Sequence, residues 1–79
     1  MMLADCRAWD ALDASPVLRH QMVELVAVGT LAELAEGWGF DSDEAAREYV
    51  RGPFERRVLR DAGAEAVEFL HVRCAERGI

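Results

Sequence analysis

The chain has 79 residues and carries nine arginines, no lysine and fifteen acidic side chains, which give a formal net charge of −6. Residues 1–50 hold ten Asp and Glu against three Arg, whereas residues 51–79 hold five against six. Phosphate contacts need clustered positive charge, so this distribution argues against nucleic acid and anionic membranes as partners and favours a basic protein surface.

The length predicts a single domain over residues 1–79 with a thin core, because a chain of this size buries only about 60% of its unfolded surface. The longest apolar run, residues 25–28, is far too short to span a membrane. Cys6 and Cys74 lie far apart, and no signal peptide is visible. We therefore expect a cytoplasmic protein with reduced cysteines.

The first amphipathic segment predicts a short helix from Met2 to Leu12. Charged residues separate its apolar positions, which recur at spacings of three: Cys6, Trp9 and Leu12. This spacing places the apolar side chains on one helical face.

Ser15 and Pro16 mark the start of a second helix. The Ser15 hydroxyl can accept a bond from a backbone N–H of the first turn, and proline suits the first helical position. An apolar stripe follows and ends at Gly29; its members are Leu18, Met22, Leu25 and Val26. Glu24 and the residues at positions 19–21 should face outward.

A capping box predicts a third helix. Thr30 is followed three residues later by Glu33, and an apolar pattern follows. Gly37 and Gly39 come soon afterwards, so this helix must be short.

A second capping pattern predicts a fourth helix. Asp41 is followed by Glu44, so the helix should begin near Ser42. We expect it to run to about Val50 and to stop before the Gly-Pro pair at positions 52 and 53.

The segment after Pro53 carries apolar residues four apart, at Phe54, Val58, Ala62, Ala66, Leu70 and Cys74. One long helix over residues 53–77 fits this row. Two helices that meet near Ala62 and Gly63 are the alternative, since glycine weakens a helix by about 1 kcal/mol relative to alanine. No stretch resembles a strand, so we predict an all-α bundle of four to five helices with a long last helix.

Trp38 and Phe40 flank Gly39 in the corner between the third and fourth helices. Aromatic side chains bury about 150–250 Å² each and can seal a helix junction in a thin core. The alternative for Trp38 is an exposed partner contact, because tryptophan is enriched at interface hot spots.

Few residues suggest catalysis or metal binding. His71 and Cys74 share a helical face, but Cys6 and His20, the other two ligands that zinc would need, lie far away in sequence. A nucleophilic pair of Cys74 and His71 has no accompanying oxyanion feature or phosphate loop. We therefore expect no metal, no cofactor and no enzymatic activity.

Four arginines form the basic cluster of the chain, at positions 51, 56, 57 and 60. We interpret them as a solvated face with local ion pairs such as Arg57 with Asp61. A site for an anion or an acidic partner is the alternative.

Three stretches of the sequence resemble the Nif-eleven domain family: WDAL at residues 9–12, SPVLR at residues 15–19 and LAELAEGWGFDS at residues 31–42. In that family an early aromatic residue and a leucine precede an acidic-Pro-x-Leu turn, and a later helix ends in an Ala-x-x-x-Gly-aromatic corner. Ala35, Gly39 and Phe40 take these last places. Ser15 stands where an acidic residue is commoner. The resemblance covers about residues 3–50.

The resemblance implies either a small nitrogen-fixation-associated protein or the leader region of a ribosomally made peptide natural product, which modifying enzymes bind. The sequence departs from the leader pattern because no double glycine precedes a core. No Ser or Thr follows Ser42, so Cys74 has no hydroxyl partner for a thioether ring. The segment after Pro53 also has the pattern of a folded helix rather than of a loose substrate tail.

The resemblance and the acidic first part predict a non-enzymatic recognition module, or leader-like peptide, that binds a biosynthetic or modifying enzyme. The expected contacts are two tryptophans and three carboxylates: Trp9, Trp38, Asp10, Glu24 and Glu36. Two alternatives stay open. One is a substrate peptide modified in its C-terminal segment at Cys74, and the other is a structural domain that forms homo-oligomers through residues 53–77.

Overall fold

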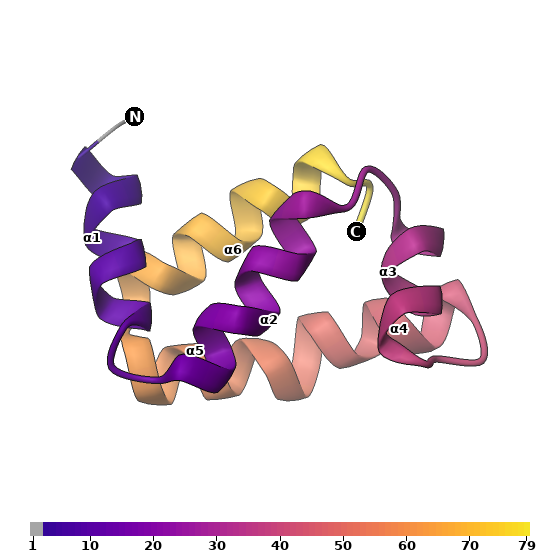
Figure 1. Ribbon diagram of the computed structural model, residues 1–79, viewed down its shortest axis with the longest axis horizontal. Helices are drawn as coiled ribbons and strands as arrows, with labels where there is room; N and C mark the ends of the chain where they lie inside the picture. Colours follow the sequence, from indigo (N-terminus) through magenta and orange to yellow (C-terminus); the bar gives the residue numbers. More distant parts are fainter. Residues whose placement is uncertain (1–2) are drawn as a thin grey trace.

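The computed structural model describes residues 3–79, with side chains described from Cys6 onward, and all regular structure in this part of the chain is helical (Figure 1). The prediction of an all-α bundle is confirmed. The expected helix start at Met2 lies outside the described residues. The elements are α1 (Leu3–Leu12), α2 (Pro16–Ala27), α3 (Leu31–Trp38), α4 (Asp43–Tyr49), the π-helical turn η1 (Val50–Phe54), α5 (Glu55–Ala62) and α6 (Ala64–Glu76).

Figure 1 shows how the helices are arranged. The elements α4, η1 and α5 follow one another as one long helical rod, and α6 returns beside α5 after a sharp break. At one end of the molecule α1 packs against α6 and α5, and at the other end α3 packs against α4. Helix α2 runs between these ends and contacts α1 and α6. Within the described residues, no helix combines the length and apolar character needed to cross a membrane.

One hydrophobic cluster takes at least one residue from every helix, and its buried members are Ala8, Leu12, Leu18, Met22, Leu25, Leu31, Leu34, Ala35, Ala46, Val50, Phe54, Val58, Ala66, Phe69, Leu70 and Cys74. In α2 the side chains of Leu18, Met22 and Leu25 are all fully buried. Their spacings of four and three place them on one face, as the sequence pattern predicted. The opposite face of α2 is left outside the core.

The predicted break at Gly52 and Pro53 is wrong, and so is the prediction that the last helix is the long one. Residues 43–62 form one helical stretch of 20 residues, whereas α6 has 13. A proline inside an α-helix lacks the N–H and clashes with the carbonyl one turn earlier. Here the wider π turn accommodates the ring, and the N–H of Glu55 donates to the carbonyl of Val50, five residues earlier. Full burial of Val50 and Phe54 holds this turn against the core.

The break lies at Gly63, as the two-helix alternative placed it. Gly63 has φ +93° and ψ 178°, a conformation that L-residues rarely adopt. Its N–H closes α5 by donating to the carbonyls of Val58 and Leu59, both at 3.1 Å. The chain then reverses direction and starts α6 at the next residue.

Alanine at Gly63 is expected to lower the free energy of unfolding by about 1–3 kcal/mol. The cost lies in the backbone, because an added Cβ would meet no atom within 4 Å. Gly37→Ala is the matched control: its site in α3 is equally open but has no positive φ. There alanine should raise stability by about 0.5–1 kcal/mol. Urea unfolding followed by circular dichroism measures both changes, and effects of the same sign would contradict this explanation of the break.

The helix caps partly follow the predictions. Thr30 Oγ1 accepts from the N–H of Glu33 at 3.2 Å, which confirms Thr30 as the cap, whereas Glu33 Oε2 accepts from the N–H of Gly29 at 2.9 Å, one residue before the position that a capping box uses. The fourth helix is capped by Ser42 rather than Asp41, with Ser42 Oγ accepting from the N–H of Ala45 at 3.1 Å. Ser15 occupies the cap position of α2, but its hydroxyl makes no capping bond. Proline at the first helical position, with its fixed φ, therefore favours the start of this helix.

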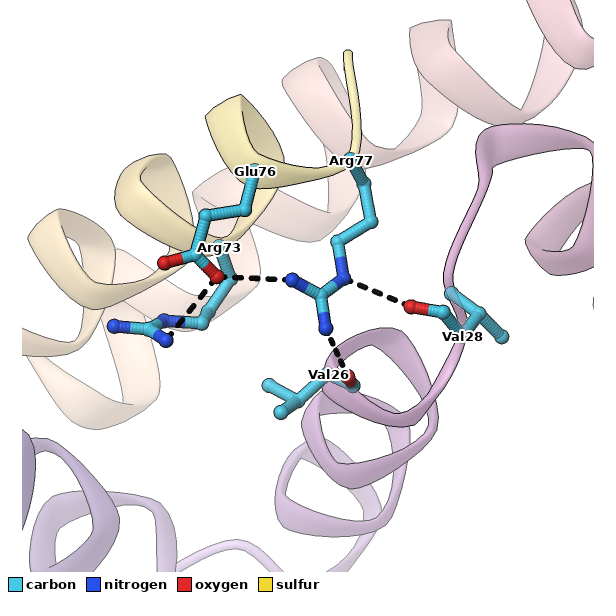
Figure 2. A network of polar contacts seen from close by, with 5 residues as sticks. All are labelled: Val26, Val28, Arg73, Glu76 and Arg77. Carbon is cyan, nitrogen blue, oxygen red and sulfur yellow. Dashed lines mark hydrogen bonds and ion pairs between the residues drawn. The ribbon is translucent and has the colours of Figure 1, made fainter.

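Arg77 joins the end of α6 to the end of α2 (Figure 2). Its Nε donates to the carbonyl of Val28 at 2.8 Å, and its Nη2 donates to the carbonyl of Val26. Glu76 accepts from Arg77 Nη1 at 2.9 Å and from Arg73 Nη1 at 3.2 Å, so it steadies the guanidinium. A helix C-terminus presents unpaired carbonyls and the negative end of the helix dipole, and the Arg77 cation satisfies both.

Candidate functional site

An aromatic cluster fills the corner between α3 and α4. Gly39, in a left-handed conformation with φ +77°, ends α3, and the N–H of Phe40 donates back to the carbonyl of Ala35 at 2.8 Å. This hydrogen bond and the left-handed Gly39 are features of a Schellman motif, which glycine permits because it has no Cβ. The turn brings Trp38 and Phe40 to the side of the molecule where α4 carries Tyr49.

The rings of this corner contact one another edge-on or tilted, except that Tyr49 and Phe54 are stacked with centroids 6.0 Å apart. The centroid of Trp38 lies 5.8 Å from that of Phe54 and 5.9 Å from that of Tyr49. The centroids of Phe40 and Tyr49 are 5.4 Å apart. Phe54 is fully buried, whereas Trp38, Phe40 and Tyr49 are half-buried and pack against the core from outside. The corner therefore seals the helix junction and also presents aromatic surface to solvent.

A groove of about 600 Å³ lies between α2 and this corner, and we call it the α2 groove. The α2 side contributes Pro16, Val17, His20, Gln21 and Glu24. The corner contributes Trp38, Phe40 and Tyr49. Val17 is 59% exposed, the most open of the exposed large hydrophobic side chains in the described part of the chain, and lies on the face of α2 that the core does not use. The α2 groove is thus a mainly apolar concavity with a polar rim.

Glu24 organises that rim. Its Oε2 accepts from Trp38 Nε1 at 3.2 Å, and its Oε1 lies 2.9 Å from His20 Nε2. The indole N–H is thereby satisfied at the edge of the α2 groove, and the ring is fixed in orientation. Gln21 adds a further polar group, since its Oε1 is buried and has no hydrogen-bond partner among the described residues.

A second concavity, of about 400 Å³, lies on the other side of α2. It is lined by Cys6, Trp9, Asp10, Arg19 and Val23. The guanidinium of Arg19 lies 5.3 Å from the Trp9 ring centroid, so this face of the indole already has a cation.

The structure brings two of the five predicted contact residues together, Glu24 and Trp38, and bonds them to each other. Trp9 and Asp10 belong to the second concavity instead. Glu36 is exposed on α3 and lines neither. Trp9 and Trp38 are half-buried, so neither is the fully exposed residue that a protruding contact would be.

Two residues of the α2 groove, Val17 and Tyr49, were not predicted from the sequence. Val17 comes directly before the first residue of the apolar stripe of α2, so it lies on a different face of the helix. An apolar residue outside the stripe is the signal that could have identified Val17 as exposed surface. Tyr49 joins the α2 groove only because the Gly39 turn folds α4 back beside α3. No pattern in the sequence specifies that approach.

A third concavity, of about 290 Å³, lies between η1 and the end of α6 and includes Cys74 and His71. His71 Nε2 contacts the carboxylate of Glu55, and Cys74 is only 6% exposed. Burial raises the pKa of the Cys74 thiol to about 11, although nearby Arg51 acts in the opposite direction. A neutral thiol is a weak nucleophile, and modification of Cys74 would require α6 to open. Among the described residues, no group of three or more His, Cys, Asp or Glu could hold a metal ion.

The raised thiol pKa predicts a pH dependence of stability. The unfolded thiol titrates near 9.0 and the folded one near 11, so the unfolded chain loses this proton first as the pH rises. The stabilising effect is complete below pH 9.0 and is lost toward pH 11, by about 1–2 kcal/mol. Chemical unfolding across this range should show a steeper loss for the wild type than for Cys74→Ala. Parallel pH profiles would contradict the burial of an intact thiol.

The arginine cluster makes a local pair, but not the expected one. Arg60 Nε donates to Asp61 Oδ1 at 2.8 Å, where the sequence suggested Arg57. This hydrogen bond holds the pKa of Asp61 below its usual value. Both side chains are exposed, so the pair contributes little to stability.

Comparison with models of known protein families, with curated proteins and with solved structures finds no match for this chain. The resemblance to Nif-eleven domains stays a prediction.

Proposed function

We propose that this chain is a non-enzymatic, cytoplasmic recognition module that binds a biosynthetic or modifying enzyme through the α2 groove. The observation that carries the proposal is the hydrogen bond between Trp38 and Glu24, which joins two predicted contact residues at one concavity. Beside them, Val17 exposes apolar surface with no intramolecular use. A half-buried tryptophan in a concavity rimmed by a carboxylate has the chemistry of an interface hot spot.

The charge distribution supports a protein partner with a basic surface. The three helices that build the α2 groove lie within residues 1–50, where acidic residues outnumber arginines by ten to three. Complementary charge accelerates encounter and fixes the orientation of two proteins. The Nif-eleven resemblance supplies the class of partner, since leaders of that type are bound by the enzymes that modify their cores.

Binding explains the described residues better than catalysis does. Cys74 carries a thiol whose raised pKa disfavours the thiolate, and the third concavity around it is the smallest of the three. The α2 groove is lined mainly by aromatic and aliphatic side chains, which bind apolar surface and do not activate a substrate.

The test uses the purified chain and each biosynthetic or modifying enzyme encoded beside its gene, with affinities measured by biolayer interferometry. Val17→Arg should weaken binding at least about tenfold, because it fills the apolar part of the α2 groove with a long side chain whose positive charge repels a basic partner. Leu59→Arg is the matched control: Leu59 is 54% exposed on α5 and does not line the groove. An equal loss for both variants, or none for Val17→Arg, would refute the proposal.

A further inference from the structure

We infer that the α2 groove receives an arginine side chain from a basic segment of the partner. This inference rests on the proposed function and adds the chemistry of the occupant. The α2 groove combines two features that suit a guanidinium: a wall of aromatic rings and a carboxylate on the rim.

The rings provide the first feature. Trp38, Phe40 and Tyr49 line one wall of the groove. The ring centroid of Tyr49 lies 5.9 Å from that of Trp38 and 5.4 Å from that of Phe40. A cation over an aromatic face is attracted by the ring quadrupole, and a planar guanidinium stacks on such a face more readily than an ammonium does. In the second concavity Arg19 already lies over Trp9, which shows the same pairing within this chain.

The rim provides hydrogen-bond acceptors. Glu24 Oε2 accepts from Trp38 and Oε1 lies against His20, and each carboxylate oxygen can accept a second hydrogen bond. A guanidinium has five N–H donors in a planar fork and no acceptor, so an arginine can donate to Glu24 while its planar group stacks on the aromatic wall.

Charge favours a separate basic partner over a second copy of this chain. Each copy carries a net charge of −6, so two copies repel each other. A basic peptide segment does not suffer this repulsion and is attracted by the acidic first part of the chain.

The experiment titrates the 15N-labelled full-length chain with two acetylated, amidated heptapeptide pools. One pool has arginine at the centre and the other has citrulline, its neutral isostere, with the remaining positions randomised. The readout is the NMR signal of the Trp38 indole N–H and of the backbone amides of α2. We expect the arginine pool to shift these signals with an affinity at least about fivefold higher than that of the citrulline pool.

Glu24→Gln tests the rim without enlarging the α2 groove, and it keeps an oxygen that can accept from Trp38. It should remove most of the preference for arginine. Glu68→Gln is the matched control, because Glu68 is an exposed carboxylate on α6 whose loss changes the net charge equally. It should leave the preference intact.

The outcomes separate this inference from the proposed function. Equal binding of the two pools would overturn the cationic occupant but leave the α2 groove as a docking site. Failure of both pools to shift Trp38 would also overturn the inference, while the Val17→Arg result would decide the proposed function independently. A dimer mass in light scattering, with α2 amides that shift on dilution, would assign the groove to a second copy and overturn the inference.

Discussion

Replacing Phe54 with alanine is expected to lower the free energy of unfolding by about 3–5 kcal/mol. Phe54 is fully buried in η1, and its ring contacts both Trp38 and Tyr49. Its removal leaves a cavity where the helical rod meets the aromatic corner. Small domains have a total stability near the lower end of about 5–15 kcal/mol, so this one change should unfold much of the population.

Urea unfolding followed by tryptophan fluorescence and circular dichroism measures the effect. Phe40→Ala is the matched control, since it removes the same side chain from a half-buried place in the same corner. Its cost should be well below that of Phe54→Ala, at about 1–2 kcal/mol. Equal costs would mean that the π turn does not face the core as described.

Replacing Arg77 with methionine is expected to lower the free energy of unfolding by about 2–4 kcal/mol. The aliphatic part of the side chain is kept, but the carbonyls of Val26 and Val28 lose their charged donor. Arg77→Lys should cost an intermediate amount, because a single ammonium cannot follow the fork of the guanidinium across two carbonyls. The side chain of Arg77 is only 17% exposed, so in the methionine variant water has little access to the two carbonyls that lose their donor.

The control for Arg77 is Arg60→Met. Arg60 is exposed and pairs with its neighbour Asp61, so its loss should change stability little. Native-state hydrogen exchange adds a local readout, since Arg77→Met should speed exchange of the last amides of α2 more than those of α4. Uniform acceleration, or none, would show that Arg77 does not join the two helix ends.

The sequence predicted those parts of the fold that depend on local chemistry. The stripe of Leu18, Met22 and Leu25 and the Thr30 cap both appear where the pattern placed them. The continuity through Pro53 was not predictable in the same way, because the π turn is stabilised by burial of Val50 and Phe54 against distant helices. Local propensity favoured a break there, and tertiary packing overrode it.

The candidate site was predictable only in part, for a related reason. Glu24 and Trp38 were selected by residue type, but 14 positions separate them, and their hydrogen bond depends on how α2 lies against α3. The ring of Trp38 packs against Phe54 in the core and also lines the α2 groove. A single sequence does not indicate that one side chain does both, and the partner contact at Trp38 stays a prediction.

Hydrogen–deuterium exchange of the full chain, with and without the partner enzyme identified by interferometry, tests the assignment of the binding surface most directly. If the partner binds in the α2 groove, slower exchange is expected only in α2 and in residues 38–49 when the partner is present. Unchanged exchange in these segments, together with protection of α5 and α6, would contradict it.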